Sequence, residues 1–209
     1  MPKYVTEFIG TFFLVLTIGL TVLGKLPVAP LAIGAALMVM VYMGGHVSGA
    51  HYNPAVSTAL LVRGKLSAAQ FLPYVISQVL GSWTACMAVY AILGKTFAPA
   101  PSPTASVTAV LLTEFLYTFA LALVVLNVAT SQKTKGNSFY GLAIGFAIVV
   151  AAFAGGPLTG GAFNPAVGLG PSLVNAALGG GSLGSVWIYL VGPLLGASLA
   201  AGAFHLQGE

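Results

Sequence analysis

Six apolar stretches of about 20 residues divide this 209-residue chain and constrain its fold more than any other feature. A helix needs about 20 apolar residues to cross the hydrocarbon core of a bilayer. Only 5% of the residues are charged, whereas a soluble domain carries about 25%. Within lipid, helices bond every backbone N–H and C=O internally. The sequence therefore predicts an all-α membrane protein with spans at about 4–24, 29–47, 67–93, 104–128, 138–156 and 182–204, the third broken or tilted near Pro73.

The rest of the composition limits the classes of function. The net charge of +4 comes from seven basic and three acidic residues, which is too little charge to predict a nucleic-acid partner. The single cysteine, Cys86, excludes an intrachain disulfide. Because no nucleophile–base set, carboxylate pair or Cys/His cluster occurs, we expect no enzyme, no cofactor and no metal site. Lys3 followed by Glu7 makes a poor signal peptide, so we expect the first span to be retained.

One tripeptide occurs twice, as Asn53-Pro54-Ala55 and Asn164-Pro165-Ala166. Pro suits the first position of a helix and the preceding Asn caps the free amides of the first turn. The apolar segments that follow, 54–62 and 165–174, rise about 15 Å each, which is half of the hydrocarbon core. Glycine-rich stretches at 44–51 and 155–163 precede them, and we expect these to be non-helical and to line a wet cavity. The pattern predicts two re-entrant half-helices.

An internal repeat relates the two halves of the chain. Glu7-Phe8 with Thr11-Phe12 is echoed by Glu114-Phe115 with Thr118-Phe119, at nearly the same spacing as the two tripeptides. Each half would hold three spans and one half-helix. Because three is odd, the halves must enter the membrane from opposite sides. We therefore expect one membrane domain built from an inverted repeat, with repeats at about 1–95 and 104–209.

The basic residues predict the orientation. Cytoplasmic loops of membrane proteins carry an excess of Lys and Arg. An N-terminus inside the cell would place five basic residues in the cytoplasm, Lys3, Arg63, Lys65, Lys133 and Lys135, and two outside, Lys25 and Lys95. We therefore expect a multi-pass protein of the plasma or inner membrane, with both termini cytoplasmic and the lipid bilayer as its surroundings.

The paired half-helices favour one kind of chemistry. Their N-termini would meet near the midplane, each carrying about half a positive charge, with the amides of Asn53 and Asn164 as N–H donors. A cation there meets positive potential from both sides, whereas a neutral molecule with lone pairs accepts hydrogen bonds. We expect carbonyl acceptors on the approaches at Gly49, Ala50, His51, Gly160, Gly161 and Ala162. The sequence predicts a conduit for water and small neutral solutes.

Four further residues have two interpretations each. Glu7 and Glu114 are intramembrane carboxylates, which are candidates for ion transport. We favour a structural role in which they accept N–H bonds from the irregular loops. His46 and His51 could be pH sensors or metal ligands, but we favour packing and hydrogen bonding within the loop.

At these residues the chain resembles the aquaporin, or major intrinsic protein, family. Residues 45–56, GHVSGAHYNPAV, resemble the family's first signature. The second is matched by Phe163-Asn164-Pro165-Ala166 with Gly170-Pro171, and further similar residues are Glu7, Glu114, Gln78 and Val191-Gly192-Pro193. The resemblance covers essentially the whole chain. It implies six transmembrane helices with two re-entrant half-helices, passive permeation down a gradient, and a homotetramer with one pore in each protomer.

The chain departs from this family after the second tripeptide. Most members carry Arg there, at the narrowest constriction, and this chain has Val167. By the family's spacing, the remaining filter positions are Ile33, Ala152 and Gly161. Water-selective members commonly carry an aromatic residue and a His at the first two, so we expect a wider and more apolar ring, unless Phe163, Phe153 or a Tyr refills it. Without Arg, cation exclusion must depend on the midplane dipoles.

The departure from the family pattern gives the expected substrates and the alternatives. We expect passage of glycerol, urea, hydrogen peroxide or metalloid hydroxides such as arsenous acid, with or without water. A water-selective channel is the main alternative, because Gly168 and Tyr189-Leu190 match neither class fully. An ion- or proton-coupled transporter would need Glu7 or Glu114 as its ionisable group. A non-conducting structural relative is the third alternative.

Overall fold

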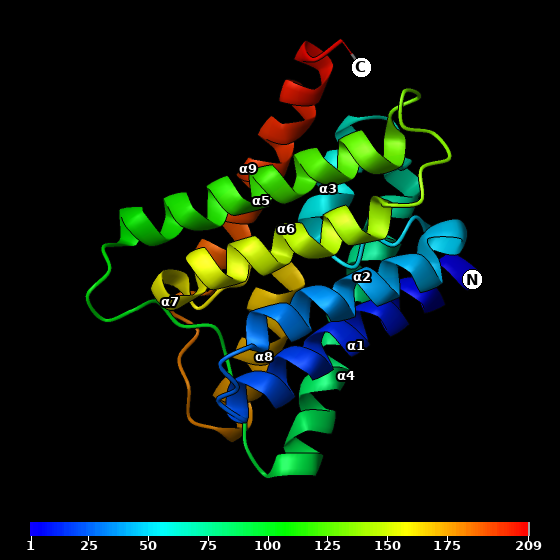
Figure 1. The fold of residues 1–209 in the computed structure, drawn as a ribbon. Helices are drawn as coiled ribbons and strands as arrows, with labels where there is room; N and C mark the ends of the chain where they lie inside the picture. Colours follow the sequence, from blue (N-terminus) through cyan, green and yellow to red (C-terminus); the bar gives the residue numbers. More distant parts are fainter. Residues whose placement is uncertain (209) are drawn as a thin grey trace.

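The computed structural model describes residues 1–208 and contains helices but no strand in that range (Figure 1). The helices are α1 (Pro2–Leu23), α2 (Ala29–Ser48), α3 (Pro54–Val62), α4 (Ala68–Leu93), α5 (Val107–Thr130), α6 (Tyr140–Ala154), α7 (Gly156–Thr159), α8 (Pro165–Leu178) and α9 (Val186–Leu206). Five of them, α1, α2, α4, α5 and α9, are long and apolar enough to cross a membrane. The predicted third span is unbroken, because α4 continues through Pro73, which lies early in this helix.

Helix α6 is the sixth crossing helix, although it is shorter than expected. Its 15 residues rise about 22 Å, and the one-turn helix α7 continues its path after Gly155. Six crossings return the chain to the side where it began. We call this the terminal side: it holds both termini, the α3–α4 turn and the α5–α6 loop, and the opposite side holds the α4–α5 linker (Figure 1).

The two halves of the chain pack in the same way. Helix α1 packs against α2 and α4, and α5 packs in the same way against α6 and α9. Each half-helix also packs against a helix of the other half, α3 on α9 and α8 on α4. Helices α2 and α6 join the two halves as well. At that junction Gly34 and Gly145 each lie against the other's backbone carbonyl, where a Cβ would collide. This contact pattern is that of an all-α membrane protein with an inverted repeat.

The first glycine-rich stretch is mostly helical, so the expectation of irregular backbone over 44–51 was wrong for most of it. Helix α2 continues through Ser48 and ends at Gly49, whose φ is 87°. Gly44 lies within this helix, and a Cβ at this position would collide with the Tyr52 hydroxyl. Its missing side chain therefore serves close packing of the loop against the helix and does not interrupt the helix.

The second half-helix is longer than the predicted 165–174. Helix α8 ends at Leu178, so it has 14 residues while α3 has the expected nine. A tertiary contact holds the extra turn: the Thr96 hydroxyl donates to Asn175 Oδ1 at 2.7 Å, and the Gly179 N–H caps the Asn175 carbonyl at 2.8 Å. The stretch 155–163 also differs from the expectation, because α7 makes part of it helical.

Candidate functional site

The two Asn residues cap the half-helices as their sequence predicted. Asn53 Oδ1 accepts a hydrogen bond from the Ala55 N–H at 2.8 Å, and Asn164 Oδ1 accepts one from the Ala166 N–H at 2.9 Å. Both Asn residues have extended backbone, which is the usual conformation of an N-cap. The partial positive charges of α3 and α8 therefore lie at the two Asn side chains.

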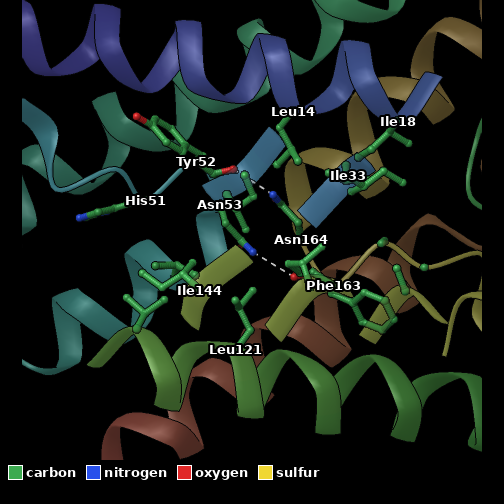
Figure 2. A pocket seen from close by; sticks show the side chains of 18 of the residues that line it. Leu14, Ile18, Ile33, His51, Tyr52, Asn53, Leu121, Ile144, Phe163 and Asn164 are labelled. Atoms are coloured by element: carbon green, nitrogen blue, oxygen red, sulfur yellow. Dashed lines mark hydrogen bonds between the residues drawn. The ribbon is translucent and has the colours of Figure 1, made fainter. Parts of the chain in front are cut away.

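The same two side chains also join the halves of the molecule. Asn53 Nδ2 donates to the carbonyl oxygen of Phe163 at 2.9 Å, and Asn164 Nδ2 donates to that of Tyr52 at 2.9 Å (Figure 2). Each amide nitrogen carries two hydrogens, so one remains for another acceptor. Both Asn residues line the central cavity, and the remaining hydrogen is available to a molecule in it.

Left-handed backbone turns both loops sharply before the half-helices begin. Ala50, Tyr52 and Phe163 have φ near 50°, a conformation that costs a residue with a side chain about 1–3 kcal/mol. Gly160 and Gly161 adopt positive φ without that cost, at 87° and 70°. Strain of this size persists only where neighbouring groups hold the loop in place.

The buried carboxylate of Glu7 holds the first loop. Its Oε1 accepts from the Ser48 hydroxyl at 2.7 Å and from the His51 N–H at 2.9 Å. Its Oε2 accepts from the Tyr52 N–H at 2.7 Å and from Gln78 Nε2 at 2.8 Å. Glu7 is 0% exposed, so these four protein donors surround it.

Glu114 holds the second loop in the same manner. Its Oε1 accepts from the Thr159 hydroxyl at 2.7 Å and from the Ala162 N–H at 3.1 Å, and its Oε2 accepts from the Phe163 N–H at 2.6 Å. Neither Glu114 nor Glu7 is among the residues that line the two cavities described below. The structure thus places both carboxylates under the loops and outside both cavities.

A hydrogen-bond chain from Glu7 orients the His51 ring. Gln78 Nε2 donates one hydrogen to Glu7 and the other to Ser57 Oγ at 2.9 Å. Ser57 Oγ also forms a hydrogen bond with His51 Nδ1, 3.0 Å away. The sequence reasoning missed Ser57, because its partners come from α4 and from the loop.

A narrow central cavity brings the four predicted filter residues together. Ile33, Ala152, Gly161 and Val167 all line it, as do both Asn residues. The centre of a water molecule can occupy about 40 Å³ of this cavity, which is room for about three waters. Aliphatic side chains such as Leu14, Ile144 and Leu121 face the two loops across it (Figure 2). The cavity therefore has an apolar wall and a polar strip along the loops.

Five of the six residues predicted to supply carbonyls line one of two cavities. Ala50, His51, Gly161 and Ala162 line the central cavity, whereas Gly49 lines only the vestibule described next. Gly160 lines neither, because it lies against the backbone of Ala100 in the α4–α5 linker. Of the aromatic residues that could narrow the ring, Phe163 and Tyr52 line the cavity, whereas Phe153 is 51% exposed.

A wider vestibule opens on the terminal side. It shares His51, Val125 and Ile144 with the central cavity and is walled by the end of α2, the α3–α4 turn and the α5–α6 loop. Lys65 and Lys135 line it. The centre of a water molecule can occupy about 580 Å³ of this space. His51 lies where the two cavities meet, and its ring points away from Asn53 in Figure 2.

Two half-helices that meet end to end beside a narrow cavity, inside a bundle of membrane-crossing helices, define a membrane channel with the aquaporin fold. The sequence model of the family described as "Major intrinsic protein" matches residues 1–204, and the chain belongs to this family. It is a channel and not an enzyme.

Similar proteins come from plants, bacteria and a parasite. The chain is 37% identical to "Aquaporin NIP1-1" of Zea mays over 216 residues, which cover 99% of this chain and 74% of that one. It is 36% identical to "Glycerol uptake facilitator protein-like 6" of Lactiplantibacillus plantarum over 222 residues, which cover 100% of this chain and 99% of that one. Its fold matches the X-ray structure of the aquaglyceroporin from Plasmodium falciparum with a TM-score of 0.87 and 25% identity, over 97% and 94% of the two chains.

Proposed function

We propose that this protein is a passive channel for uncharged polar solutes larger than water, among them glycerol, urea, hydrogen peroxide and arsenous acid, with or without water. The observation that carries the proposal is the composition of the ring. Ile33, Ala152, Gly161 and Val167 line one cavity and contribute no charged, aromatic or histidine side chain to it. The similarity to proteins named as a glycerol uptake facilitator and an aquaglyceroporin supports the same solute class.

The two faces of the cavity match the two faces of such a solute. Hydroxyl or amide groups can bond the loop carbonyls and the free amide hydrogens of Asn53 and Asn164, while carbon atoms contact the aliphatic wall. A cation would lose its water shell and meet the positive ends of α3 and α8. No Asp or Glu among the cavity's lining residues would compensate it. The geometry therefore favours neutral permeants even though no Arg is present at the filter position.

The membrane setting is part of the proposal. We place both termini in the cytoplasm of a plasma or inner membrane, because the terminal side carries five Lys or Arg residues and the opposite side two. We further propose a homotetramer with one pore per protomer, built from the repeats 1–95 and 104–209. The matched carboxylate contacts of Glu7 and Glu114 support the repeat.

A swelling assay on proteoliposomes tests the solute class. Purified protein is reconstituted, and shrinkage and re-swelling are followed by light scattering with glycerol, urea, hydrogen peroxide and arsenous acid in turn. Liposomes without protein are the control. We expect flux of at least one solute above that control. Water flux with every solute excluded would instead support the water-selective alternative, and no flux at all would support a non-conducting relative.

A coupled transporter remains the rival from another class. It would need a carboxylate that gains and loses a proton or binds a cation during transport. The carboxylates of Glu7 and Glu114 are instead surrounded by loop donors. The distinguishing measurement is solute flux with and without an imposed proton or sodium gradient, and a dependence on either gradient would support the transporter.

A further inference from the structure

The vestibule on the terminal side is lined by two lysines and, among residues 1–208, by no acidic side chain. Lys65 comes from the α3–α4 turn and Lys135 from the α5–α6 loop, and both line this cavity together with His46 from α2. Within residues 1–208 the only acidic side chains are Glu7 and Glu114, both 0% exposed and occupied by loop donors. Two cations from different halves of the chain therefore line one space, and no acidic side chain within residues 1–208 lines it with them.

The vestibule has the size and the groups of a small-molecule site. Its volume of about 580 Å³ lies within the range of about 300–1,000 Å³ that is usual for ligand pockets. Gln132 and Tyr140 add polar groups to the lining. Tyr140 is also the first residue of the 15-residue helix α6, so the positive end of that helix lies at the wall of the vestibule.

We propose that this vestibule binds a small phosphate dianion, inorganic phosphate or a phosphate monoester, and that the bound anion obstructs the pore. Ammonium groups from two separate loops suit a compact dianion with several acceptor oxygens. At physiological salt the field of an exposed Lys extends about 8 Å, so the attraction acts within the vestibule itself. Binding of the anion does not depend on the proposed channel function, whereas obstruction of the pore rests on that function.

The position of the vestibule explains how a bound anion would stop a solute. Its floor is formed by His51, Val125 and Ile144, which also line the central cavity. A molecule held between Lys65 and Lys135 would therefore lie over the mouth of the pore. The same positive field lowers the local concentration of cations, so the two lysines would contribute both to anion binding and to cation exclusion.

Isothermal titration of the purified protein in detergent tests the binding. The probes are inorganic phosphate and glycerol 3-phosphate, with glycerol as the uncharged probe. The test variant is Lys65→Gln with Lys135→Gln, and the control is Lys25→Gln with Lys95→Gln, which removes the same charge from the opposite side. We expect binding of both phosphates, weakened about tenfold in the test variant and unchanged in the control.

Two outcomes of the titration would overturn the proposal. The first is absence of phosphate binding to the unmodified protein. The two lysines would then serve only to orient the chain in the membrane and to interact with the negative C-terminal ends of α3 and α5. Equal weakening in the test and control variants would show an effect of net charge and not of a site. Retained binding in Lys65→Arg with Lys135→Arg would be the matching positive result.

Solute flux in proteoliposomes tests the obstruction separately. Re-swelling in glycerol is compared with and without phosphate monoester on both sides of the membrane, each protein being normalised to its own flux without the anion. We expect the anion to lower flux in the unmodified protein and in the opposite-side control, and not in the test variant. Binding without any effect on flux would overturn the obstruction. Binding by a protein that conducts no solute would contradict the proposed function and leave the anion site standing.

Discussion

The amide nitrogen of Asn53 lies 2.9 Å from the carbonyl oxygen of Phe163, so the tip of each half-helix is tied to the loop of the other half. The pair of bonds does two things at once. It fixes the distance between the positive ends of α3 and α8, and it leaves one hydrogen of each amide for the cavity. The two Asn-Pro-Ala copies are therefore structurally dependent on each other.

Asn53→Asp should weaken this tie and change ion selectivity. A carboxylate still accepts the N-cap bond from Ala55, but it cannot donate to the Phe163 carbonyl and it adds negative charge where the helix ends are positive. We expect lower glycerol flux and a measurable cation conductance in planar bilayers. Asn164→Asp should act in the same direction, because its contacts are equivalent. Unaltered conductance in both variants would contradict the midplane barrier.

Val167→Arg should narrow the ring and reduce solute flux more than water flux. Val167 lines the central cavity and is 3% exposed, so a longer side chain there occupies the space that a solute needs. Stopped-flow light scattering gives the water and glycerol permeabilities of the same vesicles. Val167→Leu is the matched control, because it adds bulk without charge. Equal loss of both permeabilities, with normal folding, would count against Val167 as a filter residue.

Ser57→Ala should destabilise the first loop. The substitution removes the acceptor for Gln78 Nε2 and the hydrogen-bond partner of His51 Nδ1, all of them buried, at a cost of about 1–3 kcal/mol. Thermal unfolding in detergent measures the loss. Ser198→Ala is the control, since that hydroxyl bonds only the carbonyl of Leu194 in its own helix. A melting temperature lowered equally by both substitutions would argue against the chain from Glu7 to His51.

Glu7→Gln should impair folding without revealing a transport role. The carboxylate accepts four hydrogen bonds, and an amide at the same place turns one acceptor into a donor that faces other donors. We expect a loss of about 3 kcal/mol of stability. Glu114→Gln should cost less, because Glu114 has three such bonds. Thermal unfolding and folded yield measure both effects.

The transport interpretation of these carboxylates predicts a different result. If Glu7 or Glu114 carried protons, flux in the unmodified protein would follow an imposed proton gradient, and the Gln variant would lose that dependence while remaining folded. We expect flux in the unmodified protein to depend on the solute gradient alone. The assay is the re-swelling measurement repeated at several gradients.

Several features of the site were predictable because their causes are local. Apolar stretches of about 20 residues predict spans, and Asn before Pro predicts a capped helix start, since both depend on neighbouring residues only. Both copies of the tripeptide do start helices. The lining of one cavity by Ile33 and Val167 was predicted by the spacing of the family and not by local physics.

Other features depended on partners far along the chain. The need for a glycine at position 44 depends on the close approach of the Tyr52 hydroxyl, and the last turn of α8 is held by the bond from Thr96 to Asn175. Gly160 is kept from both cavities by the α4–α5 linker. No pattern in the sequence pairs these residues, because each contact forms only after the helices have packed.

The sequence by itself determined that this chain spans a membrane with two half-helices that begin at Asn53 and Asn164, because hydropathy and helix capping act over a few residues. Only the tertiary structure decided which residues these two helix starts contact. Packing of the two halves bonds Asn53 to Phe163 and Asn164 to Tyr52, and it brings Lys65 and Lys135 to one vestibule. Such contacts join residues that are far apart in the chain, and their geometry is set by the packing of α2 against α6 and of each half-helix against the other half.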